Sequence, residues 1–271
     1  MTMMMLITLI GYLNERSIII EQSLQLVYSL YIISIDNVCP IKTESKMNYS
    51  IGFDVYGTLV DPVDMGQHLE TLIGNHATEF GQLWHEKKVE YAFRRALMRQ
   101  YADFTVCTQQ ALQYCLNVYQ ITLSSTEQQA LMAKFSQLSA FEDVIPGLNE
   151  LAKQGHFLAA FSNGPELSVR KLLTNSQIMP HLQSVISVDD LHTYKPNPDV
   201  YHYLMKRVQT DNNTCMMVSS NAWDVIGAKA AGLQAVWVKR GANKLFDPWD
   251  IQPDLIVSDL IELADVLKQK S

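Results

Sequence analysis

Three charged residues of this sequence could take part in covalent catalysis, in which a carboxylate attacks the substrate. They are Asp54, Lys195 and Asp224. Asp54 comes directly after the apolar run 51–53, while Lys195 and Asp224 lie in polar segments much further along the chain. A carboxylate that follows a buried strand is costly unless it is paired or functional. An aspartate can attack a substrate and carry a covalent intermediate, which divides one difficult step into two easier ones. We therefore expect Asp54 to be either paired with a cation or functional.

Polar clusters occur at four places that follow apolar runs. The clusters are DVYGT at 54–58, SNG at 162–164, YKP at 194–196 and SSNAWD at 219–224. The carboxyl ends of parallel strands meet at one edge of a sheet, and ligands of such sheets bind beyond those ends. A parallel sheet would therefore bring the four clusters together at one site.

From residue 141 onward the chain alternates between helical segments and short apolar runs. This alternation predicts a Rossmann-like α/β fold, in which a parallel sheet is covered by helices on both faces. The expected strands are 51–53, 157–161, 185–188, 215–218, 235–238 and 255–257, and the expected helices are 148–154, 165–174, 198–208, 223–231 and 260–268.

Between residues 63 and 140 the apolar residues recur at helical spacing, as Val89 and Phe93 do. The run SSTEQ at 124–128 has the residues of a helix capping box, which predicts that a helix begins there. We therefore expect an inserted helical cap domain. The predicted domains are the cap at 63–140 and an α/β core domain made of 47–62 and 141–271.

Residues 1–46 form an N-terminal extension of doubtful status. Their apolar runs are interrupted by charged residues such as Glu15 and Arg16, and none reaches the roughly 18 to 20 residues that a membrane helix needs. Arg16 is the first basic side chain, too late for the basic start of a secretory signal. Three interpretations stay open: an extension translated from a misplaced start codon ahead of Met47, a membrane-associated anchor, or an extra helix packed on the body.

The composition is that of an ordinary folded protein without a nucleic-acid surface. The 271 residues include 21 basic and 28 acidic side chains, for a formal charge of -7, whereas nucleic-acid binding needs a basic face. One local cation in a pocket still suffices for a small anionic substrate. The four cysteines show no CxxC spacing, so we expect buried thiols in a reducing cytoplasm and neither disulfides nor zinc. We expect no nucleic-acid partner and no membrane.

The four clusters, in this order and each at an expected strand end, resemble the four sequence motifs of the haloacid dehalogenase superfamily. The likeness is greatest to its type II L-2-haloacid dehalogenase branch and runs from about Met47 to the C-terminus, with the helical insertion included. The resemblance implies metal-independent hydrolysis of short-chain 2-haloacids to 2-hydroxyacids through an ester on Asp54. It implies no cofactor, a 2-haloacid anion as the substrate, and a homodimer formed through the cap.

The resemblance also implies roles for individual residues. Lys195 would pair with Asp54 and stabilise charge at the ester, and Asp224 would orient Lys195 and the water that hydrolyses the ester. The implied catalytic set is Asp54, Thr58, Lys195, Ser219, Asn221 and Asp224. The implied substrate-binding set is Tyr56, His85, Ser162, Asn163, Tyr201 and Trp223.

Several of these residues also have an ordinary structural explanation. Residues 162–164 suit a strand-to-helix turn with a helix cap. Tyr201 and Trp223 suit aromatic packing on a helix. The functional interpretation therefore depends on the complete set and not on any single member.

Two departures separate this sequence from the phosphatases of the superfamily. Phosphatases resemble DxD at the first motif, whereas Tyr56 stands here in the second position. Ser219, Ser220 and Asn221 replace part of the acidic set that binds Mg²⁺, which leaves Asp224. A phosphoryl group between Asp54 and Asp224 without a metal would face unscreened like charge, whereas a halide leaves as a stable anion. We therefore expect no metal site, with a phosphatase-type hydrolase and a non-enzymatic binding module as the alternatives.

A third departure lies in the first long helix of the expected cap. The dehalogenase branch carries an arginine there that receives the halide, and the run LWHEKKVEY at 83–91 places His85 at that position. Arginine is always charged, whereas histidine is only partly charged at neutral pH. His85 is then a weaker halide acceptor, a sign of a changed substrate, or a solvated histidine on a helix. Helical spacing is expected to direct Lys87 and Lys88 elsewhere.

Overall fold

The computed structural model describes residues 48–269, apart from the side chains of residues 63 and 64. The chain from Lys46 onward forms one compact unit. The predictions made for residues 1–46, including the three interpretations of that extension, lie outside the described residues.

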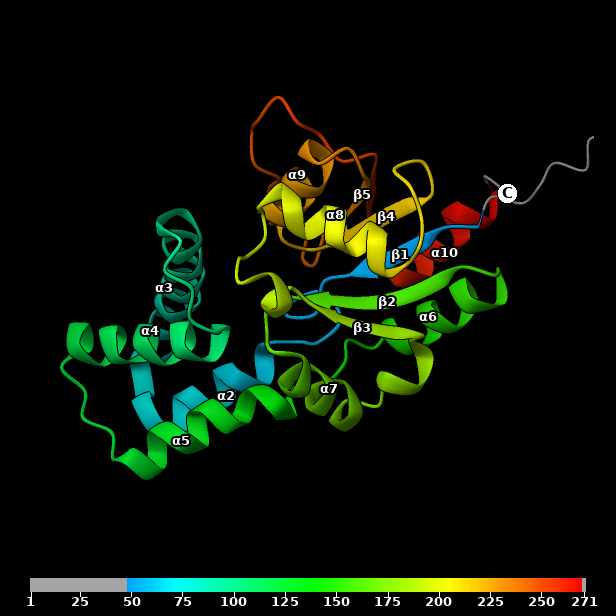
Figure 1. Ribbon diagram of the computed structural model, residues 1–271. Helices are drawn as coiled ribbons and strands as arrows, with labels where there is room; N and C mark the ends of the chain where they lie inside the picture. Colours follow the sequence, from blue (N-terminus) through cyan, green and yellow to red (C-terminus); the bar gives the residue numbers. More distant parts are fainter. Residues whose placement is uncertain (1–47, 270–271) are drawn as a thin grey trace, which may run out of the picture. The chain divides into compact units, whose positions relative to one another are not determined.

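A six-stranded parallel sheet forms the centre of the described part of the chain (Figure 1). Its strand order is β3-β2-β1-β4-β5-β6, so β1 pairs with both β2 and β4. Every predicted strand is confirmed to within one residue at each end. The strands are β1 (Ser50–Phe53), β2 (Phe157–Ser162), β3 (Ser184–Ser187), β4 (Cys215–Ser219), β5 (Gln234–Val238) and β6 (Leu255–Val257).

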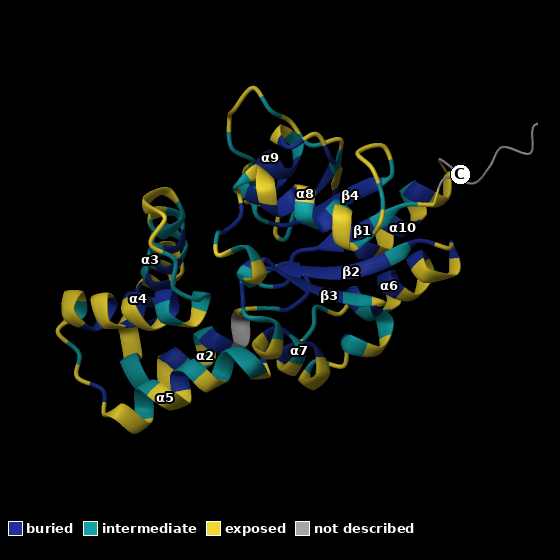
Figure 2. Cartoon of the chain, in the orientation of Figure 1, coloured by how far each residue is buried: buried dark blue, intermediate teal, exposed yellow. Residues whose placement is uncertain are grey.

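Side chains of the strands alternate between two hydrophobic cores, one on each face of the sheet. In β2, Leu158 and Ala160 belong to one core, whereas Ala159 and Phe161 belong to the other. Successive residues of a strand point to opposite faces, so a strand that is apolar throughout must be covered on both sides. The strands are accordingly the most continuously buried part of the chain (Figure 2).

Helices cover both faces, as the alternation in the sequence predicts. The first core is completed by α6 (Val144–Lys153), α7 (Glu166–Asn175) and α10 (Leu260–Gln269), and the second by α8 (Pro198–Arg207) and α9 (Ala222–Ala230). Short 3₁₀ turns at Met179–His181 and Val188–Leu191 flank β3. None of the helices in the described part of the chain has the length and apolar content needed to cross a membrane.

A helical insertion separates β1 from β2, which confirms the predicted cap as part of the fold. Its helices are α2 (Val63–Ile73), α3 (Ala77–Met98), α4 (Phe104–Tyr119) and α5 (Ser125–Lys134), with 3₁₀ turns at Gly74–His76 and Phe135–Gln137. The capping box predicted at the start of α5 forms, since Ser124 and Glu127 each bond the other's backbone N–H. A β-bridge between Val60 and Ala140 joins the two ends of the insertion. The division of the chain at 63 and 140 into separate domains stays a prediction.

Several contacts connect the insertion to the sheet domain, and three of them lie in α3 or directly after it. The hydroxyl of Tyr101 donates to the carboxylate of Asp189, and the hydroxyl of Tyr194 donates to the carbonyl of Ala102. On α3, the ring of Phe93 packs edge-on against Trp223 at the start of α9, with 5.4 Å between ring centroids. These contacts hold α3 beside the loops that follow the strands.

The close packing of α6 on α10 gives a test of the fold. A Cβ added at Gly147 would lie 2.6 Å from the Cβ of Leu260 and 2.7 Å from its carbonyl carbon. We predict that Gly147→Ala lowers the free energy of unfolding by about 1–3 kcal/mol, because backbone atoms must move apart. Urea unfolding followed by circular dichroism measures this change.

Gly66 in α2 provides the matched control. A Cβ at this helical position meets nothing within 4 Å, so Gly66→Ala is expected to raise the stability by up to about 1 kcal/mol through helix propensity alone. Equal stability of the two variants would contradict the predicted α6–α10 contact.

Candidate active site

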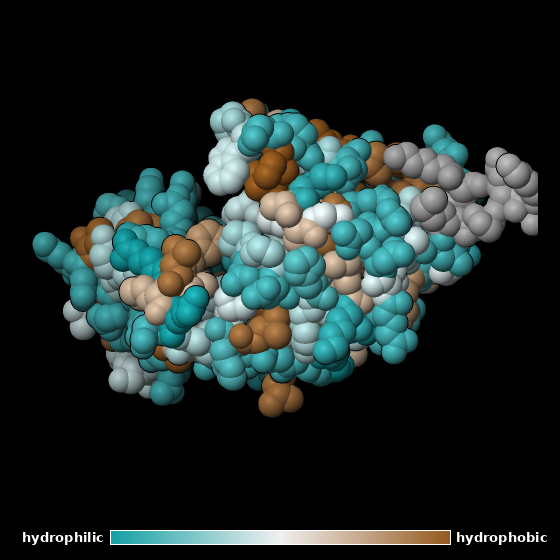
Figure 3. Space-filling model, turned by 45° about the horizontal axis from the view of Figure 1, so that its top comes forward, coloured by the Kyte–Doolittle hydropathy of each residue, from teal (hydrophilic) through white to brown (hydrophobic). Residues whose placement is uncertain are grey.

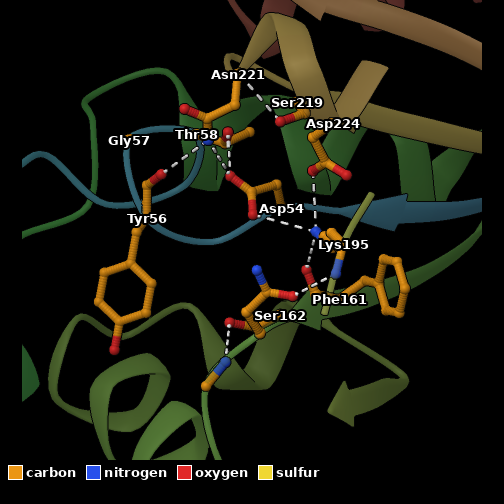
Figure 4. A network of polar contacts seen from close by, with 12 residues as sticks. Asp54, Tyr56, Gly57, Thr58, Phe161, Ser162, Lys195, Ser219, Asn221 and Asp224 are labelled. Carbon is orange, nitrogen blue, oxygen red and sulfur yellow. Dashed lines mark hydrogen bonds and ion pairs between the residues drawn. The ribbon is translucent and has the colours of Figure 1, made fainter. Parts of the chain in front are cut away.

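The four polar clusters meet at the carboxyl ends of the strands, where the sequence predicts them to meet. Asp54 follows β1, Ser162 ends β2, Asn221 lies between β4 and α9, and Asp224 lies in the first turn of α9 (Figure 4). Lys195 lies in the loop that connects α8 to the 3₁₀ turn that follows β3. The parallel topology thus brings Asp54 and Lys195, 141 positions apart in the chain, to within hydrogen-bonding distance.

The ammonium of Lys195 is the centre of the site. It is fully buried and donates to Asp54 Oδ1 at 3.2 Å, to Asp224 Oδ2 at 2.9 Å and to the carbonyl of Phe161 at 2.8 Å. An ammonium has three N–H donors, so all of them are used. The carbonyl of Phe161 is a functional group that the sequence analysis missed, because a backbone oxygen carries no signal in the residue types.

The second oxygen of Asp54 is held by two neutral side chains. Thr58 Oγ1 and Asn221 Nδ2 each donate to Asp54 Oδ2 at 2.9 Å. Together with Lys195, three side chains therefore fix the orientation of a carboxylate that is 7% exposed. A carboxylate oriented in this way presents its remaining lone pairs to one side of the site, as a nucleophile must.

Asp224 lies behind Lys195 and is fully buried. Burial raises the pKa of its carboxyl, while the charge of Lys195 opposes this increase. The sequence predicts a substrate contact for Tyr201, but the structure places its hydroxyl on Asp224 Oδ1 at 2.8 Å. Burial, followed by the charge of Asp224, raises the pKa of Tyr201 well above 10, so this hydroxyl remains a proton donor to Asp224.

The serines of the fourth cluster support the residues around them. The hydroxyl of Ser219 accepts from the N–H of Asn221 at 3.1 Å, which orients the loop that carries the Asn221 amide. Ser220 was absent from the predicted site, yet its N–H donates to Thr58 Oγ1 at 2.9 Å and its hydroxyl donates to the carbonyl of Gly57 at 2.7 Å. Its place between two predicted residues is the only feature of the sequence that points to it.

In the second cluster, one side chain stabilises the turn itself and another helps to position Lys195. Ser162 Oγ accepts from the N–H of Gly164 at 3.1 Å, as in an ordinary turn, but its own proton remains available. Asn163 Oδ1 accepts from the backbone N–H of Lys195 at 3.0 Å and so helps to position that lysine. Trp223 packs on Phe93 of the insertion, as the packing alternative predicts.

A pocket of about 460 Å³ opens beside the Asp54 network, between the sheet domain and the insertion. Tyr56 and Asn221 form its inner wall, and Figure 4 shows the ring of Tyr56 directed away from the hydrogen-bond network. The outer wall is mainly apolar and includes Met65, Leu69, Trp84 and Leu138. A smaller pocket of about 210 Å³ lies on the other side of Tyr56 and Phe135.

His85 and Lys88, both on α3, line the larger pocket. His85 keeps contact with solvent; the protein around it, and then the charges of Lys88 and Lys244, lower the pKa of its imidazole below 6.5. Even a modest lowering leaves His85 mainly neutral at pH 7. His85 therefore lies where the sequence predicts but supplies little positive charge there.

The expectation that Lys88 points elsewhere is wrong. Residues three apart on a helix lie on the same face, so Lys88 shares the pocket face with His85, and only 8% of it is exposed. Lys87, in contrast, is turned away and forms an ion pair with Glu90. The prediction treated the two lysines together, although one helical step of about 100° separates their directions.

Residues 50–232 match the family model of haloacid dehalogenase-like hydrolases. The chain is 32% identical to an (S)-2-haloacid dehalogenase of Pseudomonas fluorescens, over 79% of this chain and 94% of that protein. It is 35% identical to (S)-2-haloacid dehalogenase 4A of Burkholderia cepacia, over 70% of this chain and 83% of that protein.

Solved structures show the same fold. The L-2-haloacid dehalogenase of Xanthobacter autotrophicus with chloropropionic acid covalently bound superposes with a TM-score of 0.78 and 26% identity, over 83% of this chain and 100% of that one. A phosphatase of the same superfamily from Thermococcus onnurineus superposes with a TM-score of 0.54. At 21% identity, the latter likeness concerns the fold alone.

The shared ammonium leads to a prediction about stability. Lys195→Met would leave Asp54 and Asp224 buried without their cation, and we expect a loss of about 3–5 kcal/mol in the free energy of unfolding at pH 7. Without Lys195 the pKa of Asp224 rises further above its value in the unfolded chain. Asp224 then binds its proton more tightly in the folded state, so the variant should be closest to wild type at low pH and lose stability as the pH rises.

Lys229→Met is the control for this measurement. Lys229 pairs with Asp254 at 2.7 Å on the surface, with 26% and 38% of the side chains exposed. Such a pair contributes at most about 1 kcal/mol, so urea unfolding at pH 5 and pH 8 should separate the two variants. A similar loss in both, without pH dependence, would contradict the interpretation.

Proposed function

The chain belongs to the haloacid dehalogenase-like hydrolases, and within this family we propose that it hydrolyses short-chain 2-haloacids to 2-hydroxyacids. One observation carries the proposal: the Asp54 carboxylate is oriented by Lys195, Thr58 and Asn221, while an aromatic residue, Tyr56, follows it where a phosphatase needs a second carboxyl. The names of the similar proteins support the same substrate class.

In the first step, an oxygen of Asp54 attacks C2 of the haloacid from the side opposite the halogen. The carbon–halogen bond breaks, its electron pair leaves with the halide, and an ester links Asp54 to C2. Lys195, at 3.2 Å from Asp54 Oδ1, lies where it can stabilise charge on the ester carbonyl. The nucleophile is already oriented, so little reorganisation accompanies the attack.

In the second step, water attacks the carbonyl carbon of the ester. The bond between that carbon and the oxygen on C2 breaks, which releases the 2-hydroxyacid, regenerates the Asp54 carboxylate and yields one proton. Asp224 and Asn221 flank this position and are the groups that can orient the water. Tyr201 acts indirectly, because its hydroxyl donates a hydrogen bond to Asp224 and so fixes the orientation of that carboxylate.

The substrate carboxylate needs hydrogen-bond donors near Asp54. We assign it to the hydroxyl of Ser162, whose proton is not used within the turn, and to backbone N–H groups near Tyr56. The apolar wall with Met65, Leu69 and Trp84 would hold the rest of the molecule. Small ligands are commonly held by an apolar surface with a few well-placed polar groups.

The proposed reaction needs no metal ion, for reasons of charge. The ammonium of Lys195 bonds both Asp54 and Asp224 and therefore occupies the place of a cation between them. Burial and the charge of Asp54 raise the pKa of Tyr56 to about 12, which makes it a poor general acid for phosphate-ester hydrolysis. Among the residues the structure describes, no group of three His, Cys, Asp or Glu is arranged around a common point.

Replacing the nucleophile tests the proposal. We predict that Asp54→Asn lowers the rate of chloride release from 2-chloropropionate by at least about a thousandfold, because the amide is not a nucleophile at carbon. The wild-type protein should show a covalent adduct on Asp54 when single turnovers are stopped with acid and the peptides are analysed by mass spectrometry. Asp54→Asn should show none.

Metal dependence separates this function from its alternatives. Halide release should continue in excess chelator, and hydrolysis of a small phosphomonoester should not appear when Mg²⁺ is added. Absence of halide release from 2-haloacids of either configuration between pH 5 and pH 10 would refute the proposal. Metal-dependent phosphate release would favour the phosphatase alternative, and the absence of any adduct would favour the binding module.

We also propose that the protein is cytoplasmic and forms a homodimer through the insertion. Leu97 and Met98, at the end of α3, expose 85% and 60% of their surface. On the face drawn in Figure 3, apolar residues are scattered among polar ones. A second copy of the chain would remove these two side chains from water. Leu97→Glu should therefore shift the protein from dimer to monomer in sedimentation velocity, and a monomeric wild type would refute the dimer.

A further inference from the structure

Among the residues whose side chains the structure describes, Lys88 is a buried cation without an ion-pair partner. Within the described part of the chain, its ammonium forms no ion pair, and its recorded neighbours are the rings of Phe135 at 4.9 Å and Tyr56 at 5.8 Å from the ring centroids. It lines both pockets that flank Tyr56. An unpaired buried charge destabilises a protein unless another gain offsets it, and the pocket beside Lys88 is open to a small anion.

We propose that Lys88 binds the halide that leaves C2 of the substrate. This inference rests on the proposed function, because only the displacement of halide by Asp54 produces that anion in the pocket. When the carbon–halogen bond breaks, the halide carries the electron pair and a full negative charge. An ammonium within the pocket stabilises this charge as it develops.

The other cations of the site are poorly placed for this task. All three donors of Lys195 are used by Asp54, Asp224 and the carbonyl of Phe161. Lys171 and Lys244 are exposed at the rims of the smaller and the larger pocket, where water screens their charge. Lys88 is the buried cation among the lysines that line the two pockets.

The surroundings of Lys88 suit a halide better than a carboxylate. A carboxylate is bound most strongly by several directed hydrogen bonds, whereas Lys88 offers a compact point charge next to the rings of Tyr56 and Phe135. A monatomic anion needs no directed bonds and tolerates an apolar wall. The hydroxyl of Ser162, in contrast, can donate the directed hydrogen bond that a carboxylate accepts.

The charge of Lys88 should make halide binding depend on pH. Burial lowers the pKa of Lys88 to about 8, although the charge of Asp54 opposes this change. Lys88 is then mostly charged at pH 7 and loses its proton as the pH rises through 8. The other groups that face it are Asp54 and Tyr56 after β1, His85 on α3, and Lys244 and Lys171 at the pocket rims. Tyr56 has a pKa of about 12, so it does not titrate in this interval.

Chloride binding tests the proposal without requiring turnover. The ³⁵Cl line width of a chloride solution is titrated with wild-type protein, Lys88→Met, Lys88→Arg and the control Lys87→Met. We expect Lys88→Met to weaken chloride binding by about tenfold or more, because a desolvated charge is lost. Lys88→Arg and Lys87→Met should retain binding, and wild-type binding should weaken above pH 8. Unchanged binding in Lys88→Met, or no binding by the wild type, would overturn the proposal.

A second measurement distinguishes the halide from the substrate carboxylate. Binding of lactate, the product of 2-chloropropionate hydrolysis, is measured by calorimetry on the same variants. Lys88→Met should leave lactate affinity within about twofold of wild type. A loss for lactate as large as that for chloride would overturn the assignment, since Lys88 would then serve the carboxylate.

Stability provides a check that does not depend on any ligand. Methionine has nearly the same length as lysine and no charge to bury, so Lys88→Met should unfold at a higher urea concentration than wild type. Lys87→Met removes only a partly exposed ion pair with Glu90 and should unfold at a similar or lower concentration. If chloride binding depends on Lys88 but no halide is released from 2-haloacids, the proposed function fails while the anion site remains.

Discussion

The sharing of one buried ammonium between two carboxylates is the constraint on which the rest of the site depends. Lys195 has no access to water, so its charge must be balanced within the protein, and Asp54, Asp224 and the Phe161 carbonyl do this with three hydrogen bonds. Removal of any one of them would leave a charged or polar group buried without a partner. Such an arrangement forms only when four loops end at the same place, as the strand order β2-β1-β4 ensures.

This constraint also explains the residues that support the site from behind. Asn163 holds the backbone of Lys195, Tyr201 holds the carboxylate of Asp224, and Ser220 holds Thr58, which in turn bonds Asp54. Each supports a group that bonds either the shared ammonium or the nucleophile. The hydroxyls of Tyr201 and Ser220 are already used within the protein, on Asp224 and on the carbonyl of Gly57. Side chains within the polar clusters can therefore serve to position other residues of the site.

The fold and the central triad could be predicted from the sequence, because apolar strands between helices and polar residues at strand ends follow from simple periodicities. The contributions that could not be predicted have identifiable causes. The Phe161 carbonyl is a backbone atom, and the direction of the Tyr201 hydroxyl depends on the packing of α8 against α9. The direction of the Lys88 side chain is a different case. Residues three apart on a helix share a face, so Lys88 points into the same pocket as His85, contrary to the prediction. The motifs thus determine which residues assemble, while tertiary packing determines what each of them contacts.

The core and the insertion each supply a buried lysine to the site, Lys195 and Lys88 respectively. Within the core, the ammonium of Lys195 bonds two carboxylates and a carbonyl, so none of its N–H donors is available to a departing halide. A reaction that creates an anion beside Asp54 must therefore draw its second cation from the insertion, and α3 presents two candidates one turn apart. His85 is mainly neutral because the protein around it, and then the charges of Lys88 and Lys244, lower the pKa of its imidazole. Burial also lowers the pKa of Lys88, to about 8, but the charge of Asp54 opposes this change, so Lys88 is mostly charged at pH 7. The loss of a permanent charge at position 85 is thus compatible with halide displacement, because the charge stands one helical turn further along the same face.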